Sequence, residues 1–231
     1  MINVISKLAG DRRAKMGLAG FVGVVVILGL LGWRLGLDLS VLKGCWAELN
    51  AYLVENPVAL FVALVILPGL PIPASALLVT AGVVWRAQPV MACGLAFFAI
   101  SLNLTWTYWL AAGPARNLVE KMLSRTKIVV PELPKGNYLK LILIMKLTPG
   151  MPFFFQNYFL GFLRAPFALF LPISLLCNGV IGSGFVLGGA GLADGNLKLA
   201  KWAILLVGVG VVLIQLVRRW LGRTKAERAE S

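Results

Sequence analysis

The sequence alternates long uncharged apolar runs with short basic stretches, a pattern that predicts membrane-spanning helices. A helix needs about 20 apolar residues to cross the hydrocarbon core of a bilayer. Four uncharged runs come near to that length or exceed it, and we expect each to be a transmembrane helix: 17–33, 87–115, 165–193 and 202–217. Residues 38–56 instead carry apolar side chains at helical spacing between polar ones. This segment is predicted to be an amphipathic helix in the membrane interface.

Two further apolar segments carry prolines near their centres. Proline cannot continue a helix, and the arms on either side are each about half a bilayer long. We therefore predict two re-entrant helical hairpins, at 57–86 and 139–164. The alternative is that both segments are proline-kinked spans. The hairpin tips would contain Pro68, Gly69, Pro71 and Pro73 in the first segment, and Pro149, Gly150 and Pro152 in the second.

The two hairpin segments repeat the same features in the same order. Each tip has the form Pro-Gly-x-Pro and is followed by an apolar arm with a glycine, Gly82 or Gly161. An arginine and a full span come next in both. Opposed hairpins of this kind are typical of inverted-repeat transporters, in which broken backbone at membrane depth lines a cavity. We therefore expect an all-α polytopic membrane protein with about four transmembrane helices and two opposed re-entrant hairpins in an inverted repeat.

The distribution of basic residues favours this topology. The chain has 22 basic and 9 acidic residues, a net charge of +13. With a cytoplasmic N-terminus and two re-entrant segments, roughly fifteen basic residues face the cytoplasm, as the positive-inside tendency requires. If both segments crossed fully, the six basic residues of 116–140 would lie outside. We expect cytoplasmic N- and C-termini, a surface helix at the start of 116–140, and a multi-pass protein of the cell membrane, in bacteria the inner membrane.

Composition excludes several classes of protein. Hydrophobic residues make up 59% of the chain and charged residues 13%, against about 45–50% and 25% in soluble domains. A soluble enzyme, a disordered chain and a secreted disulfide scaffold are therefore not expected. The basic charge belongs to loops at an anionic membrane face, so no nucleic-acid partner is expected. There is no histidine, and the three cysteines are far apart. We accordingly expect no metal, no cofactor and no enzymatic activity.

The chain divides into three parts on this interpretation. Residues 1–56 hold the first transmembrane helix and the interfacial helix. Residues 57–193 form the membrane core with both hairpins. Residues 194–231 hold a short polar loop at 194–201, the last transmembrane helix and a basic cytoplasmic tail.

The second hairpin carries the motif through which the chain resembles a known family. It reads Lys146-Leu147-Thr148-Pro149-Gly150-Met151-Pro152, followed by Asn157-Tyr158-Phe159-Leu160-Gly161. Over about 55–192 the chain resembles the DedA superfamily, whose core is the SNARE-associated or VTT domain, and within it the Golgi-protein branch. Lys146 stands where arginine is usual, and Leu70-Pro71 replaces the acid that bacterial members carry after the first Pro-Gly. The resemblance implies a membrane lipid translocase for polyprenyl phosphates or phospholipids.

Lys146 is the leading candidate site residue, because an ionisable side chain in hydrocarbon needs a partner or a cavity. Its expected role is to bind a lipid phosphate, and the alternative is that its side chain reaches the interface. Other polar residues near the hairpins could contact the headgroup or serve only as anchors and helix–helix contacts: Arg86, Arg164, Gln156, Asn157 and Asn103. The resemblance also implies Glu55 as a possible coupling acid.

Three functions remain open from the sequence. The first is a flippase or scramblase whose partners are membrane lipids with phosphate-bearing headgroups. The second is an ion-coupled transporter of a small anion, since basic groups within the membrane suit anions. The third is a membrane assembly protein that transports nothing. A homo-oligomer is possible in each case.

Overall fold

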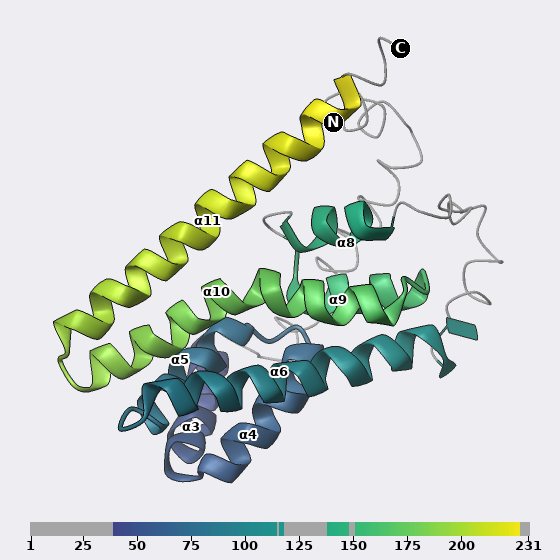
Figure 1. Cartoon of the computed structure of the whole chain (residues 1–231). Helices are drawn as coiled ribbons and strands as arrows, with labels where there is room; N and C mark the ends of the chain where they lie inside the picture. Colours follow the sequence, from purple (N-terminus) through teal and green to yellow (C-terminus); the bar gives the residue numbers. More distant parts are fainter. Residues whose placement is uncertain (1–38, 115, 118–137, 148–150, 227–231) are drawn as a thin grey trace. The chain divides into compact units, whose positions relative to one another are not determined.

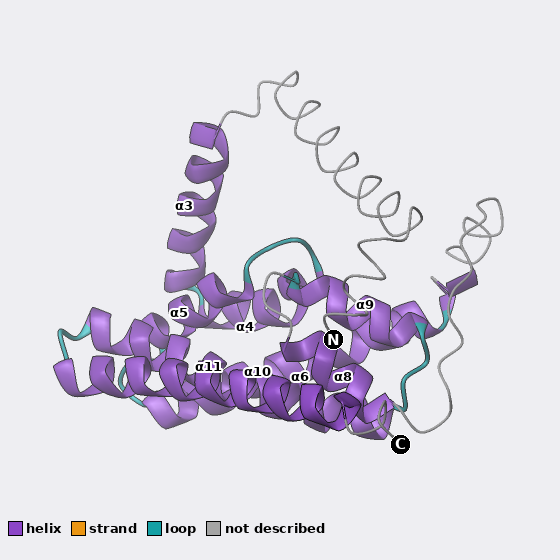
Figure 2. Cartoon of the chain, turned by 90° about the horizontal axis from the view of Figure 1, so that it is seen from above, coloured by secondary structure: helices purple, strands orange, loops and turns teal. Residues whose placement is uncertain are grey.

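The computed structural model describes residues 39–114, 116–117, 138–147 and 151–226. The expected span at 17–33, the expected surface helix after 116, and the tip residues Pro149 and Gly150 lie outside this described part. Contacts divide the chain into two units, Met1–Tyr52 with Gly222–Ser231, and Leu53–Leu221. The described residues form helices joined by loops and contain no strand, so the all-α prediction is confirmed for them (Figure 2). The predicted helix at 38–56 is present as α3 (Leu39–Glu55).

The unit Leu53–Leu221 contains two similar series of helices (Figure 1). The first half, 57–112, consists of α4 (Pro57–Ile66), the 3-10 helix η1 (Leu67–Gly69), α5 (Ala74–Val84) and α6 (Pro89–Ala112). The second half, 138–193, consists of α8 (Tyr138–Leu147), α9 (Phe153–Phe162) and α10 (Phe167–Ala193). Each half therefore has two helices of 10 or 11 residues, separated by a break, and then one long helix. The predicted succession of two short helices and one long helix is therefore present in both halves.

Prolines determine where these helices begin and end. Pro57 and Pro89 open α4 and α6 at positions where a missing N–H costs nothing. Pro68 lies in the 3-10 turn that ends α4, and extended backbone at Pro73 precedes α5. The helix break predicted from the three prolines of the first tip is therefore confirmed. Pro172 is accommodated inside α10.

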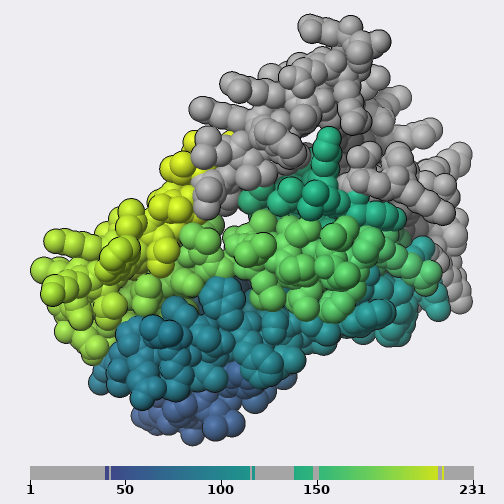
Figure 3. Space-filling view, in the orientation of Figure 1, coloured from purple at the N-terminus to yellow at the C-terminus, as the bar shows by residue number. Residues whose placement is uncertain are grey.

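The second short helix of each half packs on the long helix of the other half. A Cβ atom on Gly82 in α5 would overlap the carbonyl oxygen of Val186 in α10. A Cβ atom on Gly161 in α9 would lie 2.5 Å from the carbonyl oxygen of Tyr108 in α6. Only glycine permits such close backbone approach. The two halves are thus joined by an exchange of arms, and in the space-filling view their blue and green surfaces abut (Figure 3).

Two of the described helices, α6 and α10, are long and apolar enough to cross a membrane. The expected span at 202–217 lies within the 30-residue helix α11 (Leu197–Ala226). The polar loop expected at 194–201 is shorter than predicted, because α11 already begins at Leu197. Asn196 explains this earlier start, since its Oδ1 accepts hydrogen bonds from the backbone N–H groups of Lys198 and Leu199 at 3.0 and 3.4 Å. Such capping stabilises the first turn of a helix.

Candidate functional site

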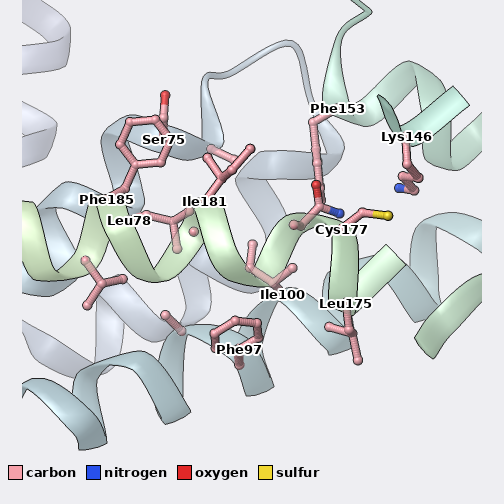
Figure 4. A pocket seen from close by; sticks show the side chains of 15 residues that line it. Ser75, Leu78, Phe97, Ile100, Lys146, Phe153, Leu175, Cys177, Ile181 and Phe185 are labelled. Atoms are coloured by element: carbon pink, nitrogen blue, oxygen red, sulfur yellow. The ribbon is translucent and has the colours of Figure 1, made fainter. Parts of the chain in front are cut away.

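A cavity of about 170 Å³ lies where the two halves meet (Figure 4). Its walls come from α5, α6, α8, α9 and α10, so both halves contribute to it. Ser75 in the first turn of α5 and Phe153 at the start of α9 both line it. The residues that immediately follow the two helix breaks therefore border one space. This agrees with the contact between η1 and α9.

The first break is held by α6. The Val65 carbonyl, at the end of α4, accepts a hydrogen bond from Asn103 Nδ2 and another from Trp106 Nε1, each at 2.7 Å. Gly69 packs directly on the Trp106 ring, where any Cβ atom would overlap it. Because α4 ends at Ile66, this carbonyl is among the last ones of the helix, which have no intrahelical partner. Asn103 therefore satisfies broken backbone at the tip, which supports its helix-contact role over a role in the pathway.

The second break carries Lys146, in the last turn of α8. Its side chain is 8% exposed, and its Nζ donates a hydrogen bond of 2.6 Å to Asn157 Oδ1 in α9. The same ammonium lies 5.3 Å from the ring centroids of both Phe153 and Phe170. Contacts of this kind with a ring face stabilise a cation. The protein thus encloses the Lys146 ammonium between α9 and α10.

Lys146 has no carboxylate partner among the described residues. That part of the chain contains three acidic residues: Glu48, Glu55 and Asp194. Asp194, at the end of α10, pairs with Arg86 Nε at 3.1 Å. A buried charge without an opposite charge is costly, and one amide and two rings offset only part of that cost. An anion bound beside Lys146 would offset that cost.

Two buried polar atoms, one on α9 and one on α10, have no hydrogen-bond partner within the described ranges. One is Asn157 Nδ2, the other amide atom of the side chain that accepts from Lys146. The other is Ser174 Oγ in α10, which is fully buried. Ser174 lies one helical turn from Phe170 and one from Cys177, which lines the cavity. Buried donors are normally paired, so these two atoms stand out, although neither Asn157 nor Ser174 lines the cavity.

The other predicted site residues have different surroundings. Gln156 Nε2 donates to Met151 O at 3.0 Å and so supports the backbone at the second break. Arg86 is half exposed in its pair with Asp194. Arg164 is exposed and has a φ of 50° in the turn after α9. Neither arginine, nor Glu55, lines the cavity that Lys146 lines. Their expected roles stay predictions.

The tip prolines that the structure describes also differ in burial. Pro68 is fully buried, whereas Pro71, Pro73 and Pro152 are exposed. Both helices that follow a break begin without a side-chain cap and without an acidic residue in the first turn. The first N–H groups of such a helix lack intrahelical partners and favour negative charge.

Sequence reasoning missed Phe153, Phe170, Ser174 and Cys177. The spacing gives one signal in retrospect, because Phe153 and Asn157 in α9, like Phe170 and Ser174 in α10, are four residues apart. Each pair lies on one helix face. Comparison of the chain with family models, with curated proteins and with solved structures finds no match, so the function is inferred from the site.

Proposed function

We propose that the chain is a membrane lipid translocase, a flippase or scramblase, for a lipid with a phosphate-bearing headgroup. The observation that carries this proposal is Lys146, a buried lysine beside a helix break, without a carboxylate partner in the described part of the chain. A phosphate would supply the missing negative charge. The charge contact would be strong because the ammonium is shielded from water.

The surroundings of Lys146 support an anionic ligand. Asn157 Nδ2 and the Ser174 hydroxyl are two more buried donors that have no partner among the residues that the structure describes. Uncapped helix starts at α5 and α9 border the same cavity, and unwound segments with such starts bind anionic groups in transporters. In this proposal the breaks after α4 and α8 are tips of two opposed re-entrant hairpins within the cell membrane.

The proposed mechanism follows from the cavity walls. Because α5 packs on α10 and α9 packs on α6, each short arm would move by sliding on a long helix of the other half. A small shift of either arm would expose Lys146 to one side of the membrane. The headgroup would then pass the breaks while the protein offsets the cost of placing its charge at membrane depth.

Proteoliposomes test the proposal. Purified protein is reconstituted with headgroup-labelled phospholipid or polyprenyl phosphate, and movement between leaflets is followed by chemical quenching of the outer label. Lys146→Met is compared with Lys140→Met, a lysine in the same helix that does not line the cavity. We expect the parent and Lys140→Met to move lipid at the same rate. Lys146→Met should be at least about tenfold slower, the effect of losing about 1.4 kcal/mol of a charged contact.

Three results would contradict the proposal. Equal rates in the parent and Lys146→Met would remove Lys146 from the mechanism. Uptake of a labelled soluble anion without lipid movement would identify an anion transporter instead. If neither flux occurs and the chain co-purifies with a stoichiometric partner, the protein serves in an assembly.

A further inference from the structure

We propose that the cavity beside Lys146 receives a single hydrocarbon chain, and that Gly182 limits how far this chain enters. The ligand class is a single-chain amphiphile with an anionic head. This inference deepens the proposed function and rests on it for the role of Lys146 as the head-binding group.

The size of the cavity argues for one chain. Its volume is about 170 Å³. An apolar cavity of about 150 Å³ in another protein stays dry and binds benzene. The cavity therefore accommodates a hydrocarbon segment of comparable volume, and a second chain beside the first does not fit.

The shape and lining of the cavity argue for a chain with one charged end. Its wall on α10 runs from Leu175 to Val186, a rise of about 16 Å along the helix. Most lining side chains are apolar, and Lys146 is the charged one among them. Figure 4 places Lys146 at one end of the space and Phe185 toward the other, with Ile181 between them. A narrow apolar space with a cation at one end matches an anionic head with one tail.

Gly182 lies on the wall of this space, about 7.5 Å along α10 from Cys177. A Cβ atom at Gly182 would meet only Leu78 Cδ1, at 3.6 Å, an ordinary contact. This glycine is therefore not needed for close backbone packing, unlike Gly82. A larger side chain at Gly182 would occupy the space of the tail and leave the space around Lys146 open.

Cys177 lines the cavity close to Lys146 and reports on its occupancy. A variant with Cys45→Ala and Cys93→Ala keeps it as the single thiol. This protein is placed in phosphatidylcholine nanodiscs and its reaction with N-ethylmaleimide is timed by intact-mass spectrometry. The probes are inorganic phosphate, hexyl phosphate, dodecyl phosphate and didodecyl phosphate. Dodecyl phosphate should slow labelling roughly tenfold at about ten times its dissociation constant. Inorganic phosphate and the two-chain lipid should not slow it.

Gly182→Leu should abolish protection by dodecyl phosphate and retain protection by hexyl phosphate. Gly94→Leu is the matched control, because Gly94 is exposed on α6 with no atom near its Cβ position, and it should behave as the parent. Phe185→Ala removes a lining side chain at the far end and should extend protection to a hexadecyl tail. This variant tests the same limit even if Gly182→Leu does not fold.

Equal protection by dodecyl and didodecyl phosphate would overturn the single-chain inference. Protection by inorganic phosphate alone would reduce the cavity to a headgroup site and also overturn it. The lipid-movement assay separates this inference from the proposed function. Protection of Cys177 without lipid movement leaves the chain site standing and removes the translocase. Lipid movement without protection supports the translocase and removes the chain site.

Discussion

Gly82 in α5 lies so close to the carbonyl oxygen of Val186 in α10 that no Cβ atom fits between them. On the other side of the same contact, Gly189 packs in the same way on the Val79 carbonyl. Gly161 repeats the relationship in the second half, against Tyr108 in α6. The glycines that the sequence places after each proline tip are therefore points of close backbone contact between the two halves.

Alanine substitutions test these contacts. Gly82→Ala and Gly161→Ala should each destabilise the protein by about 1–3 kcal/mol, because the added methyl group overlaps backbone atoms of a packed helix, which cannot rotate aside as a side chain can. Gly94→Ala should stabilise it by about 0.5–1 kcal/mol, since its Cβ position is open and alanine favours the helix. Thermal unfolding in detergent measures all three. A melting temperature for Gly82→Ala equal to that of Gly94→Ala would contradict the packing.

Substituting Lys146 alone should lower stability, whereas substituting Lys146 and Asn157 together should not. Lys146→Met alone removes a buried charge but leaves Asn157 Oδ1 without its donor, at a cost of about 1–3 kcal/mol. Lys146→Met combined with Asn157→Leu removes both polar groups, and stability should equal or exceed that of the parent. Chemical denaturation of the three proteins checks this order. A double variant that is less stable than Lys146→Met would show that the pair is kept for stability.

The two hydrogen bonds to the Val65 carbonyl predict that substitutions of Asn103 and Trp106 have non-additive effects on stability. In Asn103→Leu or Trp106→Phe, the other residue still donates to this carbonyl, and each substitution should cost about 0.5–1.5 kcal/mol. In the double variant the Val65 carbonyl has lost both donors, adding about 1–3 kcal/mol. A double-mutant cycle on unfolding free energies measures the coupling. Simple additivity would mean that other groups satisfy the carbonyl.

Two substitutions of Arg164 distinguish the effect of backbone strain from the effect of the side chain. Its φ of 50° lies in the left-handed region, which costs a residue other than glycine about 1–2 kcal/mol. Glycine itself loses about 0.5–1 kcal/mol through chain entropy, so Arg164→Gly should gain about 0.5–1 kcal/mol. Arg164→Ala removes the same side chain and keeps the strain, so it should gain nothing. If Arg164 receives the lipid headgroup, both variants slow lipid movement equally, whatever their melting temperatures.

Local chemistry made the helices and their breaks predictable. Proline disfavours the interior of a helix, and several prolines close together, Pro68 and Pro73 among them, indicated the first break without any knowledge of neighbours. The apolar runs likewise indicated α6 and α10. Lys146 stood out because its charge contrasts with the apolar sequence around it.

Contacts between distant residues were beyond the reach of local pattern. Asn103 bonds to a carbonyl 38 residues away, and Phe170 meets Lys146 only after α8 and α10 have packed. The pairing of Arg86 with Asp194 likewise depends on α5 lying along α10. The polar residues of 194–201 predicted a loop over the whole segment. The helix α11 nevertheless begins at Leu197, because Asn196 caps its first turn.

The exchange of arms between the halves has a consequence for unfolding. The Gly82 face of α5 packs on α10, and the Gly161 face of α9 packs on α6. If either half detached, the short helix of the other half would therefore lose the helix on which its glycine face packs. We expect the helices of 57–112 and 138–193 to lose their structure together, in a single cooperative transition, although each half contains a complete set of the repeated elements.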